Sequence, residues 1–282
     1  RAFDTIAPMR ELETLIAEQK NKTISVALHD FETGRGIFIN ADEAYHPAST
    51  FKVHVMMEVF HQAEQGLLSL EDYRPIVNAF TSVADGSRFS LLESDDAEKT
   101  LYPRLGESES IAELTRLMIV RSSNLATNIL LEQIGAKSVD DFIQALGIPG
   151  VTVLRGIDDS AARRLGLNNS ATARGLTQTM KLIAEGNVFS ERASEKMIAI
   201  LRGQEFNESI PALLPRPVRV AHKTGWDGDV YHDTGIVYPE NRKPYALTIM
   251  TRGFTEGQEA EAHACMGTIS KMIYDKFHDH HI

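Results

Sequence analysis

Ser49 and Lys52 place a hydroxyl and an amine three residues apart, in the stretch Ser49-Thr50-Phe51-Lys52. On a helix, residues at this spacing share a face, so the two side chains would lie next to each other. A serine hydroxyl becomes a nucleophile when an adjacent base takes its proton, and burial can lower the pKa of a lysine enough for that role. The pair therefore predicts acyl transfer, with Ser49 attacking a strained or activated carbonyl.

The sequence after Pro47 predicts the helix that would hold this pair. Proline suits a first helical turn, and Gly66 offers a stop. Apolar residues recur between them at helical spacing, at Val53, Met56, Met57 and Phe60. This stripe would anchor the helix in a core, while the free N–H groups and positive dipole of its first turn would face a developing oxyanion.

Two later segments add polar groups to this pair. The triplet 122–124, Ser-Ser-Asn, follows a predicted helix that begins with a capping box at 110–113. The triplet 223–225, Lys-Thr-Gly, closes an alternating run over 218–221 that predicts a strand, with Lys223 near its end. Each segment is common by itself, whereas the three together are rare by chance.

In the order S-x-x-K, S-x-N and K-T-G, these segments resemble the motif set of the class A β-lactamases and penicillin-binding proteins. The resemblance extends over nearly the whole chain. The other predicted elements are a helix near 9–16, strands at 24–28, 36–39, 231–238 and 244–251, and a helix from about 258.

The resemblance implies a fold of α/β plus all-α type. Residues 1–46 and 198–282 would form a discontinuous α/β domain, with an antiparallel sheet flanked by helices. Residues 47–197 would form an inserted helical domain, and the site would lie in the cleft between the two.

The resemblance also implies the catalytic roles. Ser49 would be the nucleophile and Lys52 its base, while Ser122 would relay a proton to the leaving nitrogen. The backbone N–H groups of Ser49 and Trp226 would form the oxyanion hole.

Substrate binding follows from the same resemblance. Lys223 and Thr224 would hold a substrate carboxylate, and Lys223 would also polarise Ser122. Asn124 would bind a side-chain amide of the substrate and contact Lys52. Asn124 can also be the N-cap of a helix over 125–134, and the two roles are compatible.

The chain departs from the family pattern in two places. Ser123 stands where class A enzymes have an aspartate, which removes a carboxylate that normally stabilises the loop. The glutamate of the E-x-x-L-N segment is also missing, because matching Leu167-Asn168 to its L-N puts Arg164 at the glutamate position, and arginine stays protonated. Asp158 is our candidate for the deacylation base, with Asp159 in reserve and a solvated acidic loop as the alternative.

Other parts of the chain carry weaker signals. Trp226, directly after K-T-G, would reshape the cleft. The stretch 78–106 predicts turns and a solvated acidic face at 93–96, and it is longer than in typical members of the family. Tyr102 within it could stack on a substrate, although ordinary packing is favoured.

Histidines offer an alternative base. His232 and Asp233 could complete a Ser-His-Asp triad, but that scheme would leave Lys52 and Lys223 without roles, so it ranks below the lysine scheme. The histidine-rich tail 278–281 lacks an element that would fix ligand geometry. No metal or cofactor is expected.

Composition restricts the class of protein. The 282 residues are 43% hydrophobic with no apolar run of membrane-spanning length, which predicts a soluble globular protein. A net charge of −10 disfavours nucleic acid and anionic membranes as partners, so the expected partner is a small molecule and the expected state a monomer. The single cysteine, Cys265, is interpreted as a small buried hydrophobic residue and not as a reactive thiol. The start at Arg1 fits removal of a targeting segment, and the resemblance implies a periplasmic or secreted protein.

These observations predict a serine hydrolase that opens the β-lactam amide through a Ser49 acyl-enzyme. Two alternatives use the same scaffold. One is an esterase or a peptidase of peptidoglycan-type peptides. The other is a trap or sensor that stays acylated because it lacks a deacylation base.

Overall fold

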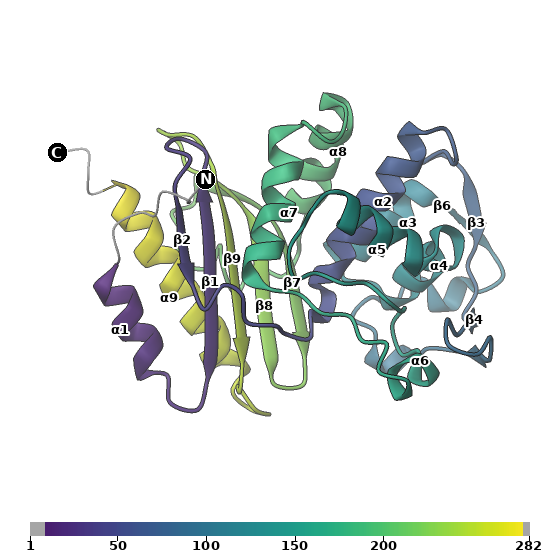
Figure 1. Cartoon of the computed structure of the whole chain (residues 1–282). Coiled ribbons are helices and arrows are strands. Elements are labelled where there is room, and N and C mark those ends of the chain that lie inside the picture. The colour runs from purple at the N-terminus through teal and green to yellow at the C-terminus, as the bar shows by residue number, and fades with distance from the viewer. Residues whose placement is uncertain (1–8, 279–282) are drawn as a thin grey trace.

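The computed structural model describes residues 9–278 as a sheet-containing part beside a helical part (Figure 1). The sheet has five antiparallel strands in the order β2-β1-β9-β8-β7. Their bounds are β1 Thr23–Asp30, β2 Gly36–Ile39, β7 Arg219–Asp227, β8 Val230–Tyr238 and β9 Tyr245–Arg252. The N-terminal hairpin therefore pairs with the C-terminal strands, with Val26 opposite Ile249. This confirms the predicted antiparallel sheet built from both chain ends.

One strand differs from the prediction. β7 pairs with β8 from Arg219 to Asp227, so Lys223 lies in the middle of the strand and not near its end. The Lys-Thr-Gly sequence continues the ladder because each of its residues faces one of β8, with Lys223 opposite Thr234. The turn comes later, at Gly228, which has the positive φ of +57° that glycine tolerates.

Helices cover both faces of the sheet. On one face, α1 (Arg10–Glu18) and α9 (Glu259–His278) share a core with Val26 and Leu28. On the other, α7 (Ala173–Glu185) shares a core with Ala27, and its Thr177 Oγ1 donates a hydrogen bond of 3.1 Å to the Ala27 carbonyl. Alternate residues of β1 thus serve opposite faces, as expected for a central strand.

The helical part is built around α2 (Lys52–Glu64). Every residue of α2 from Lys52 to Phe60 is buried, which makes it a central helix. A 3₁₀ turn, η1 (Ala48–Phe51), leads into it. The other helices are α3 Ile111–Val120, α4 Asn124–Ile134, α5 Ala136–Ala145, α6 Ser160–Arg164 and α8 Glu191–Arg202. α7 and α8 belong to the predicted helical range 47–197, yet both pack against the sheet. The domain boundaries at 47 and 197 stay a prediction.

The stretch 78–106 is only partly as predicted. It belongs to a region of short elements, namely β3 Tyr73–Pro75, β4 Phe80–Thr81, β5 Arg88–Phe89, η2 Glu93–Asp95, η3 Tyr102–Arg104 and β6 Ser108–Ser110. Glu93 and Asp95 are exposed, but Asp96 is buried, so the prediction of a solvated face was wrong for Asp96. Asp96 is buried because it accepts hydrogen bonds from the start of α4. Tyr102 is also buried, which confirms the packing interpretation.

Two features are absent from the described residues. No helix among them combines the length and apolarity needed to cross a membrane. Residues 9–278 contain no group of three or more His, Cys, Asp or Glu side chains suited to holding a metal ion. Most of the histidine-rich tail, from 279 on, lies outside the described residues. Cys265 is buried, and burial raises the pKa of its thiol to about 11.

Candidate active site

Ser49 lies in the 3₁₀ turn η1, where β7 approaches it closely. A Cβ atom on Gly225 would lie 2.9 Å from the Ser49 backbone nitrogen and 3.1 Å from the Pro47 carbonyl oxygen. Only glycine permits this approach, so the Gly of Lys-Thr-Gly brings β7 against the nucleophile segment. Within the described part of the chain, the Ser49 hydroxyl has no side-chain hydrogen-bond partner, and the residue is half-buried.

Backbone strain gathers around the predicted site. Five non-glycine residues among those described have positive φ, and three of them are Ala48 (+46°), Ser122 (+58°) and Asp158 (+57°). Ala48 directly precedes Ser49. Such conformations cost free energy and persist where the surroundings impose them, often at functional sites.

Lys52 is fully buried and reaches from α2 to the loop between α3 and α4. Its Nζ lies 2.8 Å from the Ser122 carbonyl oxygen, 2.8 Å from Asn124 Oδ1 and 3.2 Å from Ser122 Oγ. Burial lowers the pKa of Lys52 to about 7, against the opposing effect of the Asp96 charge. Near neutral pH, Lys52 therefore has a substantial neutral fraction, as a general base requires.

Ser122 stands between two lysines. Its Oγ accepts hydrogen bonds from Lys52 Nζ at 3.2 Å and from Lys223 Nζ at 3.1 Å. A hydroxyl has two acceptor sites and one hydrogen, so the hydrogen of Ser122 stays free to point elsewhere. The arrangement suits a proton relay.

The loop 122–124 is held by a different cap from the one predicted. Ser123 is the N-cap of α4, and its side chain accepts a hydrogen bond from the Ala126 amide at 3.0 Å, so the prediction of Asn124 as the N-cap was wrong by one residue. Asn124 is the first residue of the helix, which frees its side chain. Its Oδ1 accepts from Lys52, and its Nδ2 donates to the Asp95 carbonyl oxygen at 3.3 Å.

A carboxylate that sequence reasoning missed completes this loop. Asp96 Oδ1 accepts from the Asn124 amide at 3.0 Å, and its Oδ2 accepts from the Leu125 amide at 2.9 Å. The Tyr102 hydroxyl donates to the same carboxylate at 3.1 Å. The sequence held no signal for this contact, because Asp96 lies 28 residues before Asn124 in a stretch without periodicity.

Lys223 faces the same site from β7. It is fully buried, and its Nζ donates to Ser122 Oγ and, at 2.8 Å, to the carbonyl oxygen of Thr224. Burial and the charge of Lys52 lower the pKa of Lys223 well below its usual value, and Asp233 opposes both effects. The Thr224 hydroxyl makes no hydrogen bond within the described residues, so it is free to meet a ligand.

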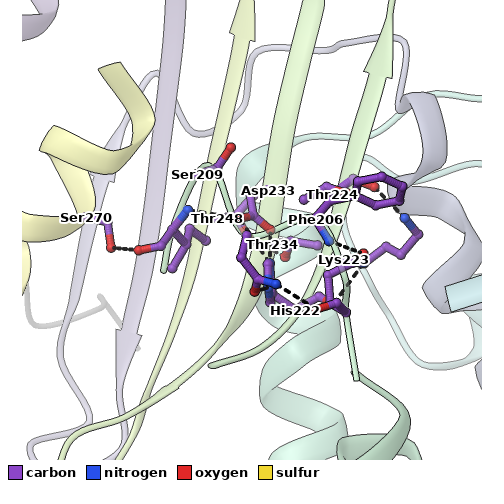
Figure 2. Close-up of polar contacts among 12 residues, drawn as sticks. Phe206, Ser209, His222, Lys223, Thr224, Asp233, Thr234, Thr248 and Ser270 are labelled. Atoms are coloured by element: carbon purple, nitrogen blue, oxygen red, sulfur yellow. Dashed lines mark hydrogen bonds and ion pairs between the residues drawn. The ribbon is translucent and has the colours of Figure 1, made fainter. Parts of the chain in front are cut away.

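Behind Lys223, β7 and β8 carry a buried polar network. Figure 2 shows His222 and Asp233 pointing toward each other beside Lys223 and Thr224, and His222 Nδ1 lies 2.8 Å from Asp233 Oδ1. Asp233 Oδ2 also accepts from the Ile210 amide at 3.0 Å. His222 Nε2 lies 3.1 Å from Asn207 Oδ1. The network thus connects the lysine strand to the segment before it.

This network excludes the alternative triad. Asp233 pairs with His222 and not with His232. His232 is buried, with its Nε2 donating to the His46 carbonyl oxygen at 2.9 Å and its Nδ1 accepting from the Thr251 amide at 3.2 Å. Both ring nitrogens are engaged with backbone, and burial lowers the pKa of His232 to about 4. Its role is to fix the segment before Ser49.

The loop after α5 separates the two candidate deacylation residues. Asp159 is buried and acts as the N-cap of α6, with Oδ1 accepting from the Ala162 amide and the Ser82 hydroxyl and Oδ2 accepting from the Val83 amide. Asp158 is exposed, and partial burial and the nearby Asp95 raise the pKa of its carboxyl group. Asp159 therefore has a structural role, while Asp158 is available to a ligand.

Ile157, in the same loop, is hydrogen-bonded to Asn128 of α4. Asn128 Oδ1 accepts from the Ile157 amide at 2.8 Å, and Asn128 Nδ2 donates to its carbonyl oxygen at 2.9 Å. Arg164, at the glutamate position of the sequence match, is exposed on α6. The buried asparagine of the loop is Asn169 and not the matched Asn168, because Asn169 Oδ1 accepts from the Leu154 and Arg155 amides.

Trp226 lies at the edge of the site. Its side chain is 62% exposed. The next residue, Asp227, lies 3.5 Å from His46, three residues before Ser49. The exposed indole is therefore free to contact a ligand beside the nucleophile.

Residues 7–277 match the sequence model of the beta-lactamase enzyme family. The chain is 24% identical over 288 residues to the extended-spectrum beta-lactamase PER-1 of Pseudomonas aeruginosa, covering 97% of this chain and 89% of PER-1. It is 26% identical over 249 residues to the carbapenem-hydrolyzing beta-lactamase KPC of Klebsiella oxytoca, covering 81% of this chain and 76% of KPC. The structure of PBP-A has the same fold, with a TM-score of 0.83 and 22% identity over 99% of this chain and 100% of PBP-A.

The fold and the family match are those of the class A β-lactamase-like serine hydrolases. The chain belongs to the beta-lactamase enzyme family. This confirms the predicted family and fold, and it makes the protein a hydrolase of a family that acts on β-lactams.

Proposed function

We propose that this protein opens the β-lactam amide by forming an acyl-enzyme at Ser49. The observation that carries the proposal is the hydrogen-bonded chain from Lys52 through Ser122 to Lys223. Ser49 is three residues before Lys52, and its backbone nitrogen lies against Gly225 of the strand that carries Lys223. A binding module does not require two lysines that converge on one serine. A proton relay from an attacking hydroxyl to a leaving nitrogen requires both a base, here Lys52, and a positive charge that holds the relay serine, here Lys223.

Acylation starts at Lys52. In its neutral form the amine has two hydrogens, and the Ser122 carbonyl oxygen and Asn124 Oδ1 can only accept them. The remaining lone pair takes the proton of Ser49 Oγ, which forms a bond to the carbonyl carbon. The N–H groups of Ser49 and Trp226 stabilise the oxyanion. When the C–N bond breaks, the proton passes from Lys52 through Ser122 Oγ to the leaving nitrogen.

Substrate binding uses the other side of the site. Lys223 supplies positive charge for a substrate carboxylate, and the Asp233 charge raises the pKa of Lys223 against the effect of burial. The free Thr224 hydroxyl donates a hydrogen bond to the same carboxylate. Asn124 offers its amide to the acyl side chain. The expected partner is a small anionic amide or ester. That the protein is a monomer, and that it is located in the periplasm or outside the cell, stay predictions.

Release of the acyl group is the step with the fewest supporting groups. We assign it to a water molecule held by Asp158, whose raised pKa brings its carboxylate closer to the basicity that a general base needs. The apolar Ile157 at the position tied to Asn128 favours a second candidate function, a penicillin-binding protein that is acylated quickly and released slowly. A mutant of PBP-A has been solved as an acyl-enzyme complex with penicillin G.

One experiment tests both candidates. A chromogenic β-lactam and a p-nitrophenyl ester are assayed side by side, while intact mass spectrometry follows the acylated protein. We expect a single added mass that peptide mapping assigns to Ser49, and its loss in Ser49→Ala. Steady β-lactam turnover supports the β-lactamase, and a stable adduct with little turnover supports the slowly released form. Labelling that persists in Ser49→Ala contradicts the mechanism, and hydrolysis of the ester alone would favour an esterase.

A further inference from the structure

Asp96 is a buried carboxylate that the chemistry described so far does not use. It is 2% exposed and accepts four hydrogen bonds, from the Asn124, Leu125 and Glu98 amides and the Tyr102 hydroxyl. Within residues 9–278 it forms no ion pair. Its two oxygens instead contact four hydrogen-bond donors, two of which are backbone N–H groups at the start of α4.

The charge of Asp96 reaches the base of the site. It is the one charged group that opposes the effect of burial on the Lys52 amine. Lys223 from β7 is the other charged group next to Lys52, and the two lysines share Ser122 Oγ. Burial and the Asp96 charge, with smaller effects of Glu93 and Asp158, raise the pKa of the Tyr102 hydroxyl. Asp96 is therefore the negative charge that balances the two lysines from the Lys52 side.

Geometry connects Asp96 to Lys52 by a second route. The backbone of Asn124 is bonded to Asp96, and the side chain of the same residue accepts from Lys52 at 2.8 Å. The cap of α4, Ser123, is neutral, so it fixes the helix start without supplying charge. A single residue outside the three motifs thus both holds the loop and faces the lysine with negative charge.

We propose that Asp96 is a positioning residue for acyl transfer, which supplies from the 78–106 stretch the carboxylate that the Ser122-Ser123-Asn124 loop lacks. It orients Asn124 toward Lys52 and keeps the amine partly charged. The reaction that it serves is the proposed one, but its effect on Lys52 is measurable without any reaction.

The test is a titration of Lys52 by ¹³C NMR on protein with ¹³Cε-labelled lysine. The Lys52 signal is assigned by its absence in Lys52→Arg, and the wild-type midpoint is expected near 7. Asp96→Asn removes the negative charge, so the ammonium form is less stable and the midpoint falls, by on the order of one pH unit. An unchanged midpoint in folded Asp96→Asn overturns the proposal.

Matched variants separate charge from packing. Glu98 is a buried acid of the same stretch that pairs with Arg121 at 3.2 Å, and Glu98→Gln should leave the Lys52 midpoint in place. Tyr102→Phe keeps the ring but removes one donor from Asp96, so the carboxylate is less neutralised and the midpoint should rise. If Asp96→Asn does not fold, an unmoved midpoint in Tyr102→Phe overturns the proposal instead.

Acylation supplies the second readout. The acid limb of the acylation rate of Ser49 by a β-lactam should move to lower pH in Asp96→Asn, together with a lower plateau. A lower plateau with an unmoved limb would mean that Asp96 has a structural role alone. If wild-type protein is not acylated although the NMR midpoint shifts in Asp96→Asn, the proposed function fails and the inference about Asp96 stands.

Discussion

Asn128 and Ile157 exchange two hydrogen bonds, because the side-chain amide of Asn128 accepts from the Ile157 N–H and donates to the Ile157 carbonyl oxygen. This pair ties the loop between α5 and α7 to helix α4, which also carries Asn124 of the site. The tied residue has an apolar side chain, and Asp158 follows it in a left-handed conformation. The residue that we propose for release of the acyl group, Asp158, is therefore the direct neighbour of the residue that these hydrogen bonds hold in place.

The pKa of Lys52 predicts a pH dependence of acylation. Only the neutral amine accepts the Ser49 proton, so the acylation rate should rise with pH through about 7 and fall about tenfold per pH unit well below it. Lys223 must stay charged to bind a carboxylate, and its lowered pKa predicts a fall at alkaline pH that begins below the usual lysine value of about 10.4. Stopped-flow acylation between pH 5 and 10 measures both limbs, and a flat profile would contradict the role of Lys52.

Lys52→Ala removes the proposed base. We expect the acylation rate to fall by roughly 10²- to 10⁴-fold, which is the usual contribution of a general base. His232→Ala should slow acylation far less, since His232 contacts backbone at both nitrogens, although losing the bond to the His46 carbonyl oxygen should lower stability. The Lys52 scheme is wrong if the two variants lose acylation equally at a temperature where both are folded.

Lys223→Ala should separate anionic from neutral substrates. Loss of a charge-assisted contact costs about 1.5 to 3 kcal/mol, so anionic β-lactams should need roughly ten- to a hundredfold higher concentrations for half-maximal acylation. Neutral p-nitrophenyl esters should lose much less. Lys223→Arg, which keeps the charge, is the control and should retain the preference for anions. Equal losses for both substrate classes would place the lysine in the chemistry itself or in the structure.

Gly225→Ala tests the close approach of β7 to the nucleophile. The new Cβ would lie 2.9 Å from the Ser49 nitrogen, so strand and turn must move apart, and displacement of the reacting groups should slow acylation on the order of a hundredfold. The control is Gly267→Ala in α9, where the new Cβ meets its neighbours at 3.4 Å or more and should preserve activity. Acylation rates near wild type in Gly225→Ala would contradict the proposed use of the Ser49 amide.

The fold and the lysine pair could be predicted because they depend on local patterns. The apolar stripe at Val53, Met56, Met57 and Phe60 indicated a buried helix. The start of that helix then indicated where Ser49 and Lys52 lie relative to each other. Asp96 and the His222–Asp233 pair could not be predicted, since each depends on segments that only the tertiary fold brings together. For the same reason, a carboxylate that looked solvated in an acidic run proved to be the most buried of that run.

The two aspartates of the loop after α5 are expected to differ in function. Asp159 is the N-cap of α6 and holds the 82–83 backbone, so Asp159→Asn, which keeps a capping oxygen, should lower stability modestly and leave turnover in place. Thermal unfolding and steady-state β-lactam hydrolysis measure the two effects. A large loss of turnover in folded Asp159→Asn would move the role of base to that residue.

Asp158→Asn should block release without affecting acylation. Only the second step needs a base for water, so the acylation burst should stay intact while the acylated protein accumulates. Intact mass spectrometry after mixing with a β-lactam measures both steps, and the rate of regain of free protein should fall by roughly 10²-fold or more. Because an aspartate reaches one methylene less far than a glutamate, we expect slow release even in the wild type. Unchanged release in Asp158→Asn would mean that another group, such as Lys52, activates the water.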